Sequence, residues 1–365
     1  MTAGTLASLS NSIFASLGLS GVVDELGVGE SPTTRECLVL IDGMGAKALA
    51  EFGKLHAIFS QNLWQKDLTS HFPSTTTVNL TSLATGTLPG VHGMLGYLVR
   101  VPRSGEPGRL LNALKWDERV DPVMWQRTPT LFERASAQGI NTSQISAKRY
   151  EGTGFTRAAL RGATFLGANQ ISEMADKTAV ALKDANSFAY VYLNNLDVAG
   201  HESGVASEKW FGALATVAEL ITTLREKLPP GVRIWVCADH GMINAKEKII
   251  FGQDNELDKD IELFGGEPRA RHLYVKSGAQ LDVKKRYQEF LGLKADVFTK
   301  AEAISKGLFG SEVTQDSDER IGDLIVIAKD EMILVDPTRI DKEGAMIGHH
   351  GGLSEDESLI PLLAY

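Results

Sequence analysis

Short hydrophobic runs that end near an acidic residue are the clearest pattern along the chain. Residues 37–41 (CLVLI) lead directly to Asp42, residues 189–193 (AYVYL) lead to Asp197, and residues 232–237 (VRIWVC) lead to Asp239. Short apolar runs without strict alternation are typical of strands that are buried on both faces of a parallel sheet. The pattern therefore predicts three such strands, each followed by a carboxylate.

Segments with helical periodicity lie between these runs. Residues 207–228 carry apolar side chains three or four positions apart, which places them on one face of a helix. Alternating strands and helices predict an α/β fold with a doubly wound, largely parallel sheet sandwiched by helices. Ligands bind beyond the carboxyl ends of the strands in such sheets, so we expect the three carboxylates to face one crevice.

Residues 251–320 have a different pattern, because they are more charged and their elements are shorter. The candidate elements are a strand at 272–275 and helices at 283–291 and 300–307. A further candidate strand, at 324–328, follows beyond this range. We interpret residues 251–320 as a small inserted α+β lobe. Residues 1–250 and 321–365 then form the core.

Composition limits the class of protein and partner. Asp and Glu number 46 and Lys and Arg number 37, a net charge of −9, which argues against a nucleic-acid scaffold. No apolar run reaches the roughly 18 residues of a membrane span. Residues 1–21 lack Lys and Arg, so we expect a packed helix there and not a secretory signal. Cys37 and Cys237 lie in apolar runs, as buried reduced thiols do, and we expect a cytoplasmic protein.

The segment after the first run, Asp42-Gly43-Met44-Gly45, allows two interpretations. Gly43, Gly45 and Ala48 match the G-x-G-x-x-A fingerprint of dinucleotide-binding enzymes, which needs a strand ending in an acid about 20 positions on. Residues 61–67 offer no clear strand of that kind. In the second interpretation, which we favour, Asp42 binds a metal ion and the glycines let the chain turn away from it.

A hydroxyl-rich segment follows at residues 71–81 (HFPSTTTVNLT). Ser and Thr are common N-caps, which explains the segment without any chemistry. A hydroxyl at a helix N-terminus also lies where the helix dipole and free N–H groups favour a phosphoryl anion. The two interpretations are compatible, but a Thr hydroxyl would need a metal ion to lower its pKa before it could attack.

Aspartate and histidine recur at the remaining candidate positions. Asp197 and His201 are one turn apart if their segment is helical, and Asp239 precedes His240 directly. A pair such as the first is often a solvated polar face, but the strand before it makes a metal site equally plausible.

A glycine-rich loop near the C-terminus adds His349 and His350, and the pattern does not choose between them. Oxygen and nitrogen donors without thiolate suit Zn²⁺ or Mn²⁺. Their number suffices for two ions about 4 Å apart.

The order of these motifs resembles the type I phosphodiesterase/nucleotide pyrophosphatase family of the alkaline phosphatase superfamily. The motifs are residues 39–43 (VLIDG), 72–76 (FPSTT), 85–93 (TGTLPGVHG), 197–201 (DVAGH), 239–241 (DHG) and 350–354 (HGGLS). The resemblance covers residues 36 to 365 except the lobe. It implies an alkaline phosphatase-like fold and a zinc-dependent hydrolase that cleaves phosphodiesters or nucleotide pyrophosphates.

The resemblance also implies two metal sites, with zinc as the expected ion and manganese as the alternative. One ion would be held by Asp197, His201 and His350, and the other by Asp42, Asp239 and His240. Thr76 would bridge toward the substrate and form a phospho-threonine intermediate.

Two of these assignments choose one of two adjacent residues. The family pattern of Pro, Ser or Thr, any residue and Thr starts here at Pro73, which selects Thr76 over Thr75. The family histidine directly precedes a glycine, which selects His350 over His349.

One position departs from the family pattern. Nucleotide pyrophosphatases have an Asn beyond the T-G-x-x-P-x-x-H-G segment that donates to a non-bridging phosphate oxygen, and this chain has Tyr97 there. A phenol can donate one hydrogen bond but is bulkier and reaches further. Tyr97 is therefore a candidate catalytic residue, and a phosphomonoesterase or phosphonate hydrolase on the same site is the alternative function.

Other classes receive less support. A nicotinamide oxidoreductase rests on the glycine match alone, and no G-x-S-x-G elbow indicates a serine hydrolase. A catalytically silent metal- or nucleotide-binding protein stays open. The expected partner is a small phosphate ester such as a nucleotide. Lys148, Arg149, Tyr150 and Arg157 flank a glycine-containing segment that is either a solvated loop or a contact for the substrate's distal anion.

Overall fold

A computed structural model describes residues 4–30, 34–105 and 108–365. Its large sheet has seven strands in the order β2-β17-β8-β1-β7-β5-β6. In chain order they are β1 (Arg35–Ile41), β2 (Trp64–Thr69), β5 (Asn141–Ser146), β6 (Thr164–Gly167), β7 (Ser187–Leu193), β8 (Arg233–Ala238) and β17 (Leu359–Ala364). β17 is antiparallel to both of its neighbours, and the other strands share one direction. The three predicted strands are confirmed as β1, β7 and β8, and they lie side by side.

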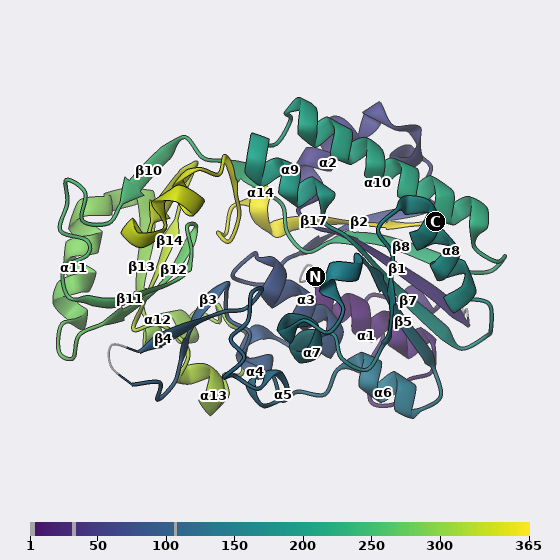
Figure 1. Cartoon of the computed structure of the whole chain (residues 1–365), viewed down its shortest axis with the longest axis horizontal. Coiled ribbons are helices and arrows are strands. Elements are labelled where there is room, and N and C mark those ends of the chain that lie inside the picture. Colours follow the sequence, from purple (N-terminus) through teal and green to yellow (C-terminus); the bar gives the residue numbers. More distant parts are fainter. Residues whose placement is uncertain (1–3, 31–33, 106–107) are drawn as a thin grey trace.

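Helices cover both faces of this sheet (Figure 1). One face carries α1 (Leu6–Ser16), α3 (Thr76–Thr85), α6 (Leu131–Ala137) and α7 (Gly154–Ala159). The other carries α2 (Ala46–Phe52), α8 (Ile171–Ala181), α9 (Asn195–Ser203) and α10 (Glu208–Lys227). α10 buries its predicted apolar face, and its N-cap Ser207 accepts the N–H of Trp210. The sandwich confirms the predicted α/β class.

A second, antiparallel sheet forms the lobe at one end of the molecule (left in Figure 1). Its strands, in the order β11-β12-β14-β13, are β11 (Ile261–Glu267), β12 (Ala270–Val275), β14 (Leu324–Ala328) and β13 (Ala295–Thr299). The predicted helices are α11 (Gln280–Leu291) and α12 (Lys300–Ser305), and both contact β13. The lobe has its own buried apolar cluster, which includes Phe251, Tyr287 and Leu324.

The lobe extends beyond the predicted boundaries at 251 and 320. The sequence pattern assigns residues 324–328 to the core, but β14 pairs with β12 and β13 in the lobe. β10 (Glu247–Ile250) pairs with β15 (Met332–Val335), and Met332 and Leu334 belong to the lobe cluster. A short apolar run is compatible with burial in either sheet, so the pattern alone does not assign it.

Short elements complete the described part of the chain. They are α4 (Pro89–His92), α5 (Pro122–Trp125), α13 (Gln315–Asp318), α14 (Glu355–Ser358), the hairpin of β3 (Leu98–Val101) with β4 (Arg109–Asn112), and the pair of β9 (Ile243–Asn244) with β16 (Gly348–His349). Within the described ranges, no helix has the length and apolar character to cross a bilayer. The chain leaves the core after β8 and returns through β16, so the carboxyl ends of the central strands lie next to the lobe.

Candidate active site

Two strand ends form the first ligand group. Asp42 follows β1, Asp239 and His240 follow β8, and all three are buried. His240 Nε2 lies 3.3 Å from Asp42 Oδ1 and 3.6 Å from Asp239 Oδ2. The Gly43 N–H donates to Asp239 Oδ1 over 3.2 Å, which ties the turn after β1 to β8. One potential ligand atom from each residue lies within 4.8 Å of the others, close enough to share one cation.

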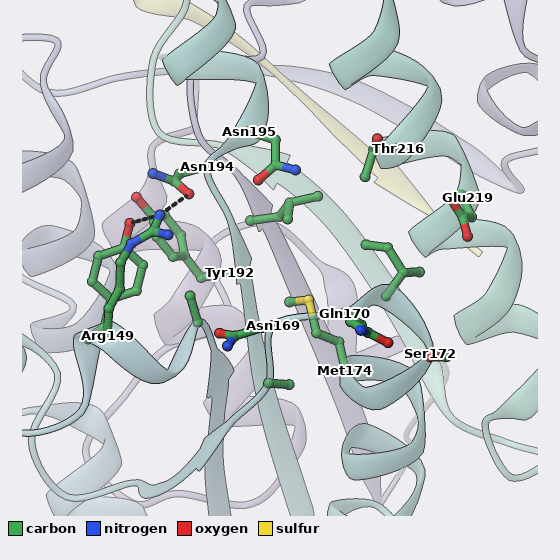
Figure 2. Close-up of a pocket in the computed structure, with 15 residues that line it drawn as sticks. Arg149, Asn169, Gln170, Ser172, Met174, Tyr192, Asn194, Asn195, Thr216 and Glu219 are labelled. Atoms are coloured by element: carbon green, nitrogen blue, oxygen red, sulfur yellow. Dashed lines mark hydrogen bonds between the residues drawn. The ribbon is translucent and has the colours of Figure 1, made fainter.

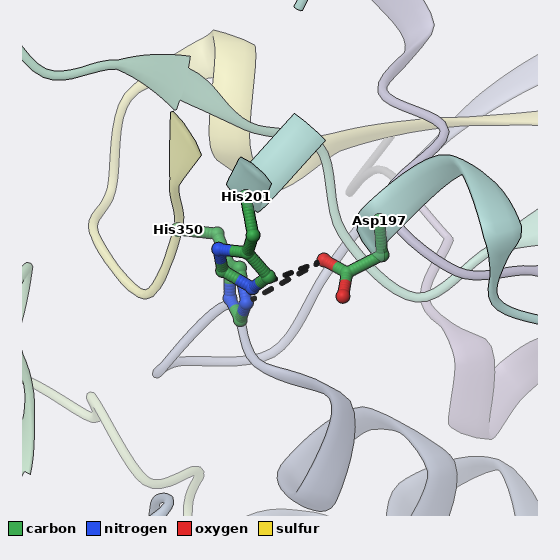
Figure 3. Close-up of side chains that lie close together, drawn as sticks. All are labelled: Asp197, His201 and His350. Atoms are coloured by element: carbon green, nitrogen blue, oxygen red, sulfur yellow. Dashed lines mark ion pairs between the residues drawn. The ribbon is translucent and has the colours of Figure 1, made fainter. Parts of the chain in front are cut away.

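The second ligand group joins α9 to the loop after β16. Asp197 and His201 lie one turn apart on α9, as the predicted helix requires, with 3.4 Å between Asp197 Oδ1 and His201 Nε2. His350 Nε2 lies 3.8 Å from the same carboxylate oxygen (Figure 3). The group therefore contains His350 and not His349, which contacts the carbonyl of Met346 instead.

The three histidines of these groups are oriented in the same way. In each ring, Nδ1 lies within hydrogen-bond distance of a backbone carbonyl, which can only accept, so Nδ1 carries the proton. The pairs are His201 with Gly348 (2.8 Å), His240 with Gly241 (2.9 Å) and His350 with Ser74 (2.9 Å). Nε2 is then the nitrogen of each ring that faces the carboxylates and could bind a cation, which is the usual arrangement of metal-binding histidines.

The two groups adjoin, and their residues fit metal ions. The rings of His240 and His350 stack with centroids 3.7 Å apart. Asp197 Oδ1 and Asp239 Oδ2 are buried without a hydrogen-bond partner. Burial and the nearby Asp42 raise the pKa of Asp239 well above its usual value, and burial raises the pKa of Asp197 to about 6. Carboxylates packed this closely need positive charge, and two divalent cations would supply it.

Thr76 lies beside the first group, at the first position of α3. Its Oγ1 is 3.4 Å from Asp42 Oδ1 and 3.2 Å from His240 Nε2. Thr75 is the N-cap of the same helix, and its side chain makes no capping hydrogen bond. The first-turn N–H groups of a helix have no partners within it, so α3 presents donors next to the Thr76 hydroxyl.

Ser74 connects the Thr76 turn to the His350 loop. Its hydroxyl donates to the carbonyl of Gly352 over 2.8 Å and accepts the N–H of Gly351 over 3.1 Å. Together with the contact between His350 and the Ser74 carbonyl, these bonds fix the two segments relative to each other.

The dinucleotide interpretation of the first glycines fails. A side chain on Gly45 would lie 2.9 Å from the Gly241 backbone and 3.0 Å from the carbonyl of Asp356, so this glycine serves close packing of two turns. β1 is flanked by β7 and β8, whereas β2 lies at the sheet edge. The strand after α2 therefore does not form the adjacent βαβ unit that the fingerprint requires.

The main cavity, of about 410 Å³, lies between the core and the lobe. The core contributes Thr76, Asp197, His201 and His350, and the lobe side contributes Glu267, Arg339 and Lys342. Tyr97 lines the same cavity, with the Arg339 guanidinium 6.0 Å from its ring centre. The structure therefore brings Tyr97 close to the other candidate residues.

A smaller cavity of about 150 Å³ adjoins Thr76 and Asp42 on the other side. It is lined mainly by aromatic and aliphatic side chains, among them Leu80, Tyr150, Phe155, Leu160 and Tyr192. Next to it, an open cleft of about 600 Å³ contains Arg149, which donates to Tyr150 Oη (2.9 Å) and Asn194 Oδ1 (3.0 Å) (Figure 2). Of the basic loop residues, Arg149 faces this cleft, whereas Lys148 pairs with Glu173 at the surface.

Comparison with models of protein families shows which family the chain belongs to. The model of the type I phosphodiesterase / nucleotide pyrophosphatase family matches residues 37–353. The chain belongs to this family. Its members are metal-dependent, and membership indicates a phosphoesterase hydrolase. Comparison with curated proteins gave no match.

Solved structures of other proteins share this fold. Murine ectonucleotide pyrophosphatase/phosphodiesterase 5 is 16% identical, with a TM-score of 0.69 over 91% of this chain and 88% of that one. The human protein is 17% identical, with a TM-score of 0.69 over 91% and 87%. Phosphonoacetate hydrolase from Sinorhizobium meliloti 1021 is 17% identical, with a TM-score of 0.67 over 91% and 90%. These likenesses confirm the predicted alkaline phosphatase-like fold.

Two site residues have no signal in the sequence motifs. Tyr192, in β7, donates its hydroxyl to Asp42 Oδ2. Glu267, at the end of β11, is 5% exposed, and its Oε2 accepts the N–H of Tyr97 over 2.9 Å while Oε1 has no partner. The sequence gives only a weak signal for Tyr192, which is a tyrosine in an otherwise apolar strand. It gives no signal for Glu267.

A buried ion pair joins the lobe to the His350 loop. Arg269, in the turn between β11 and β12, donates to both oxygens of Glu357 in α14, over 3.0 and 2.7 Å, and both side chains are fully buried. Glu357 also accepts the N–H of Gly352 (2.8 Å) and the hydroxyl of Ser354 (2.6 Å). The loop that follows His350 is thus attached to the lobe.

Proposed function

We propose that this chain is a two-metal hydrolase that cleaves a phosphodiester or nucleotide pyrophosphate bond in a small substrate such as a nucleotide. The observation that carries the proposal is the Thr76 hydroxyl within 3.4 Å of Asp42 and His240, at a helix N-terminus beside two Asp/His groups. The donor set without thiolate favours zinc, with manganese as the alternative.

The ligand groups and Thr76 take separate roles. Asp197, His201 and His350 would hold one ion, and Asp42, Asp239 and His240 the other. When bound, the ions supply Lewis-acid stabilisation of the phosphoryl charge and lower the pKa of a nearby hydroxyl.

Thr76 then acts as the nucleophile. Its hydroxyl loses its proton to solvent, and Oγ1 forms a bond to phosphorus while the bond to the leaving oxygen breaks in line. The leaving oxygen takes up a proton from solvent, and the N–H groups at the start of α3 hold phosphoryl oxygens. Water next attacks phosphorus, loses a proton to solvent and breaks the bond from phosphorus to Oγ1, which is protonated again to restore the hydroxyl. An inactive threonine-to-alanine variant of the murine relative, solved with AMP, is consistent with a threonine that is needed for turnover but not for binding.

Phosphonate hydrolysis on the same site is the second candidate. Tyr97 replaces the asparagine that donates to phosphate in nucleotide pyrophosphatases, and we propose that its hydroxyl takes this role. The phosphonoacetate hydrolase of similar fold was solved with phosphonoformate. A phosphomonoesterase would use the same groups.

Comparison of three ester classes tests the proposal. The protein is loaded with Zn²⁺ or Mn²⁺, and kcat/KM is measured for an aryl phosphodiester, an aryl monoester and an aryl phosphonate ester. We expect the diester to be the best substrate. Thr76→Ala is the matched control for contaminating activity. No turnover above this control on any ester would leave a silent binding protein as the better description.

A further inference from the structure

Two cationic side chains face the main cavity from one short segment. Arg339 ends a 3₁₀ turn (Pro337–Arg339), and Lys342 lies in the π-helical turn that follows (Ile340–Gly344). Both line the cavity of about 410 Å³ that also contains Thr76 and His350. Neither belongs to a metal-ligand group.

The local charge balance leaves these cations available. The same segment carries two carboxylates, the exposed Asp341 and Glu343, of which Glu343 lines the cavity. The fully buried Arg271 donates to Glu343 Oε2. Arg339 Nε lies 3.1 Å from Glu343 Oε1, so two guanidinium groups share one carboxylate. Lys342 is exposed and makes no ion pair or hydrogen bond with any described residue. Of the charged side chains that this segment contributes to the cavity lining, Arg339 and Lys342 are cationic, and Arg271 already offsets the charge of Glu343.

Glu267 is the lobe carboxyl that could cancel this charge. It is bound to the Tyr97 N–H deeper in the cavity. Among the described residues, Glu267 makes no ion pair with Arg339 or Lys342, so both cations remain available on this wall.

We propose that Arg339 and Lys342 form an anion subsite that binds a second negatively charged group of the substrate while its reacting phosphoryl group lies at Thr76. This inference rests on the proposed function and narrows it to compact phosphoryl compounds with a second anion. The planar donors of Arg and the point charge of Lys both suit a carboxylate or a second phosphoryl group.

Binding of non-hydrolysable probes to the metal-loaded protein tests the subsite by calorimetry. 3-Phosphonopropionate carries a carboxylate, methylenediphosphonate carries a second phosphonate, and propylphosphonate has an uncharged tail of similar size. We expect at least one two-anion probe to bind about tenfold more tightly than propylphosphonate, since hydrogen bonds to charged groups are among the stronger ones. Whichever of the two binds more tightly identifies the class of second anion.

Single substitutions assign this preference to residues. Lys342→Gln and Arg339→Gln should each reduce the preference several-fold and leave the affinity for propylphosphonate unchanged. Lys285→Gln, which removes the same charge from the exposed face of α11, should change neither. Within the described ranges Lys342 has no ion-pair or hydrogen-bond partner, so its variant separates binding from folding even if Arg339→Gln unfolds.

Three results would overturn the subsite. They are equal affinity of the wild type for all three probes, equal weakening of every probe by Lys342→Gln, and an effect of Lys285→Gln as large as that of Lys342→Gln. These measurements need no turnover. A protein that keeps the preference but hydrolyses no ester would refute the proposed function and leave the subsite standing.

Discussion

The two walls of the main cavity are built in different ways. The core wall consists of carboxylates and imidazoles at strand and helix ends, of which Asp42, Asp239 and His240 are buried and the other three are partly buried. A backbone carbonyl holds each of the three imidazoles. The lobe wall presents Arg339 and Lys342, which are partly or fully exposed and lie on a short irregular segment. Groups with little exposure on regular elements suit the chemical step, whereas exposed cations on an irregular segment suit selection among substrates. We therefore expect changes in the core wall to abolish turnover and changes in the lobe wall to alter preference.

Removal of metal ions should have the largest effect, because it acts on the whole core wall. We expect a chelator to abolish measurable hydrolysis and added Zn²⁺ or Mn²⁺ to restore it. Elemental analysis and an ester assay of the same samples measure this. Full turnover by protein shown to be free of metal would exclude the two-metal function.

Thr76→Ala should have the next largest effect. The attacking oxygen is lost while all six Asp and His ligands remain, so kcat should fall by about 10³-fold or more with the metal content unchanged. Thr75→Ala is the matched control and should stay within a few-fold of the wild type. If Thr75→Ala is inactive and Thr76→Ala is active, the nucleophile is Thr75 and not Thr76.

Tyr97→Phe tests a residue that lines the cavity together with both walls. If the hydroxyl donates to a phosphoryl oxygen, its removal should lower kcat for the best substrate by about tenfold. The ring, its packing under Arg339 and the N–H bond to Glu267 are all retained. Wild-type kinetics in this variant, together with a lower melting temperature of Tyr97→Ala, would show that the residue serves packing alone.

Glu267→Gln should have the smallest effect, on stability. Burial raises the pKa of this carboxyl from 4.5 to about 8, and the Tyr97 N–H opposes the shift only in part. Between these values the unfolded chain has lost a proton that the folded protein keeps. The contribution of this group to the free energy of unfolding therefore falls as the pH rises from about 5 to 8.

Gln cannot ionise, so the variant should lose less stability than the wild type over this range, by about 1–3 kcal/mol. Urea unfolding of the metal-free proteins at both pH values measures the difference. Glu262→Gln, on the more exposed part of β11, is the matched control and should follow the wild type. An identical pH dependence in all three proteins would contradict a neutral, buried Glu267.

The sequence predicted the core wall well, because each of its residues carries a local signal. Asp42 and Asp239 follow apolar runs, Thr76 stands at a fixed distance from Pro73, and His350 precedes a glycine. The structure brings all of them together.

The lobe wall could not be predicted in this way. Glu267, Arg339 and Lys342 lie in segments without a recognisable motif, and the folding of the lobe against the core brings them to the cavity. The predicted lobe boundary at residue 320 differs from the structure for a related reason, since the apolar run at 324–328 is compatible with either sheet. Contacts between distant segments determine this part of the molecule.

The buried pair of Arg269 and Glu357 has a consequence for motion. Breaking a fully buried ion pair by separating its partners costs several kcal/mol. A hinge movement that opened the lobe would have to break this pair or pull the Gly352 and Ser354 segment, and with it His350, out of place. We therefore expect the lobe to act as a fixed partition and not as a lid. Substrate exchange would then occur through a permanently open mouth, and domain opening would not limit the turnover rate.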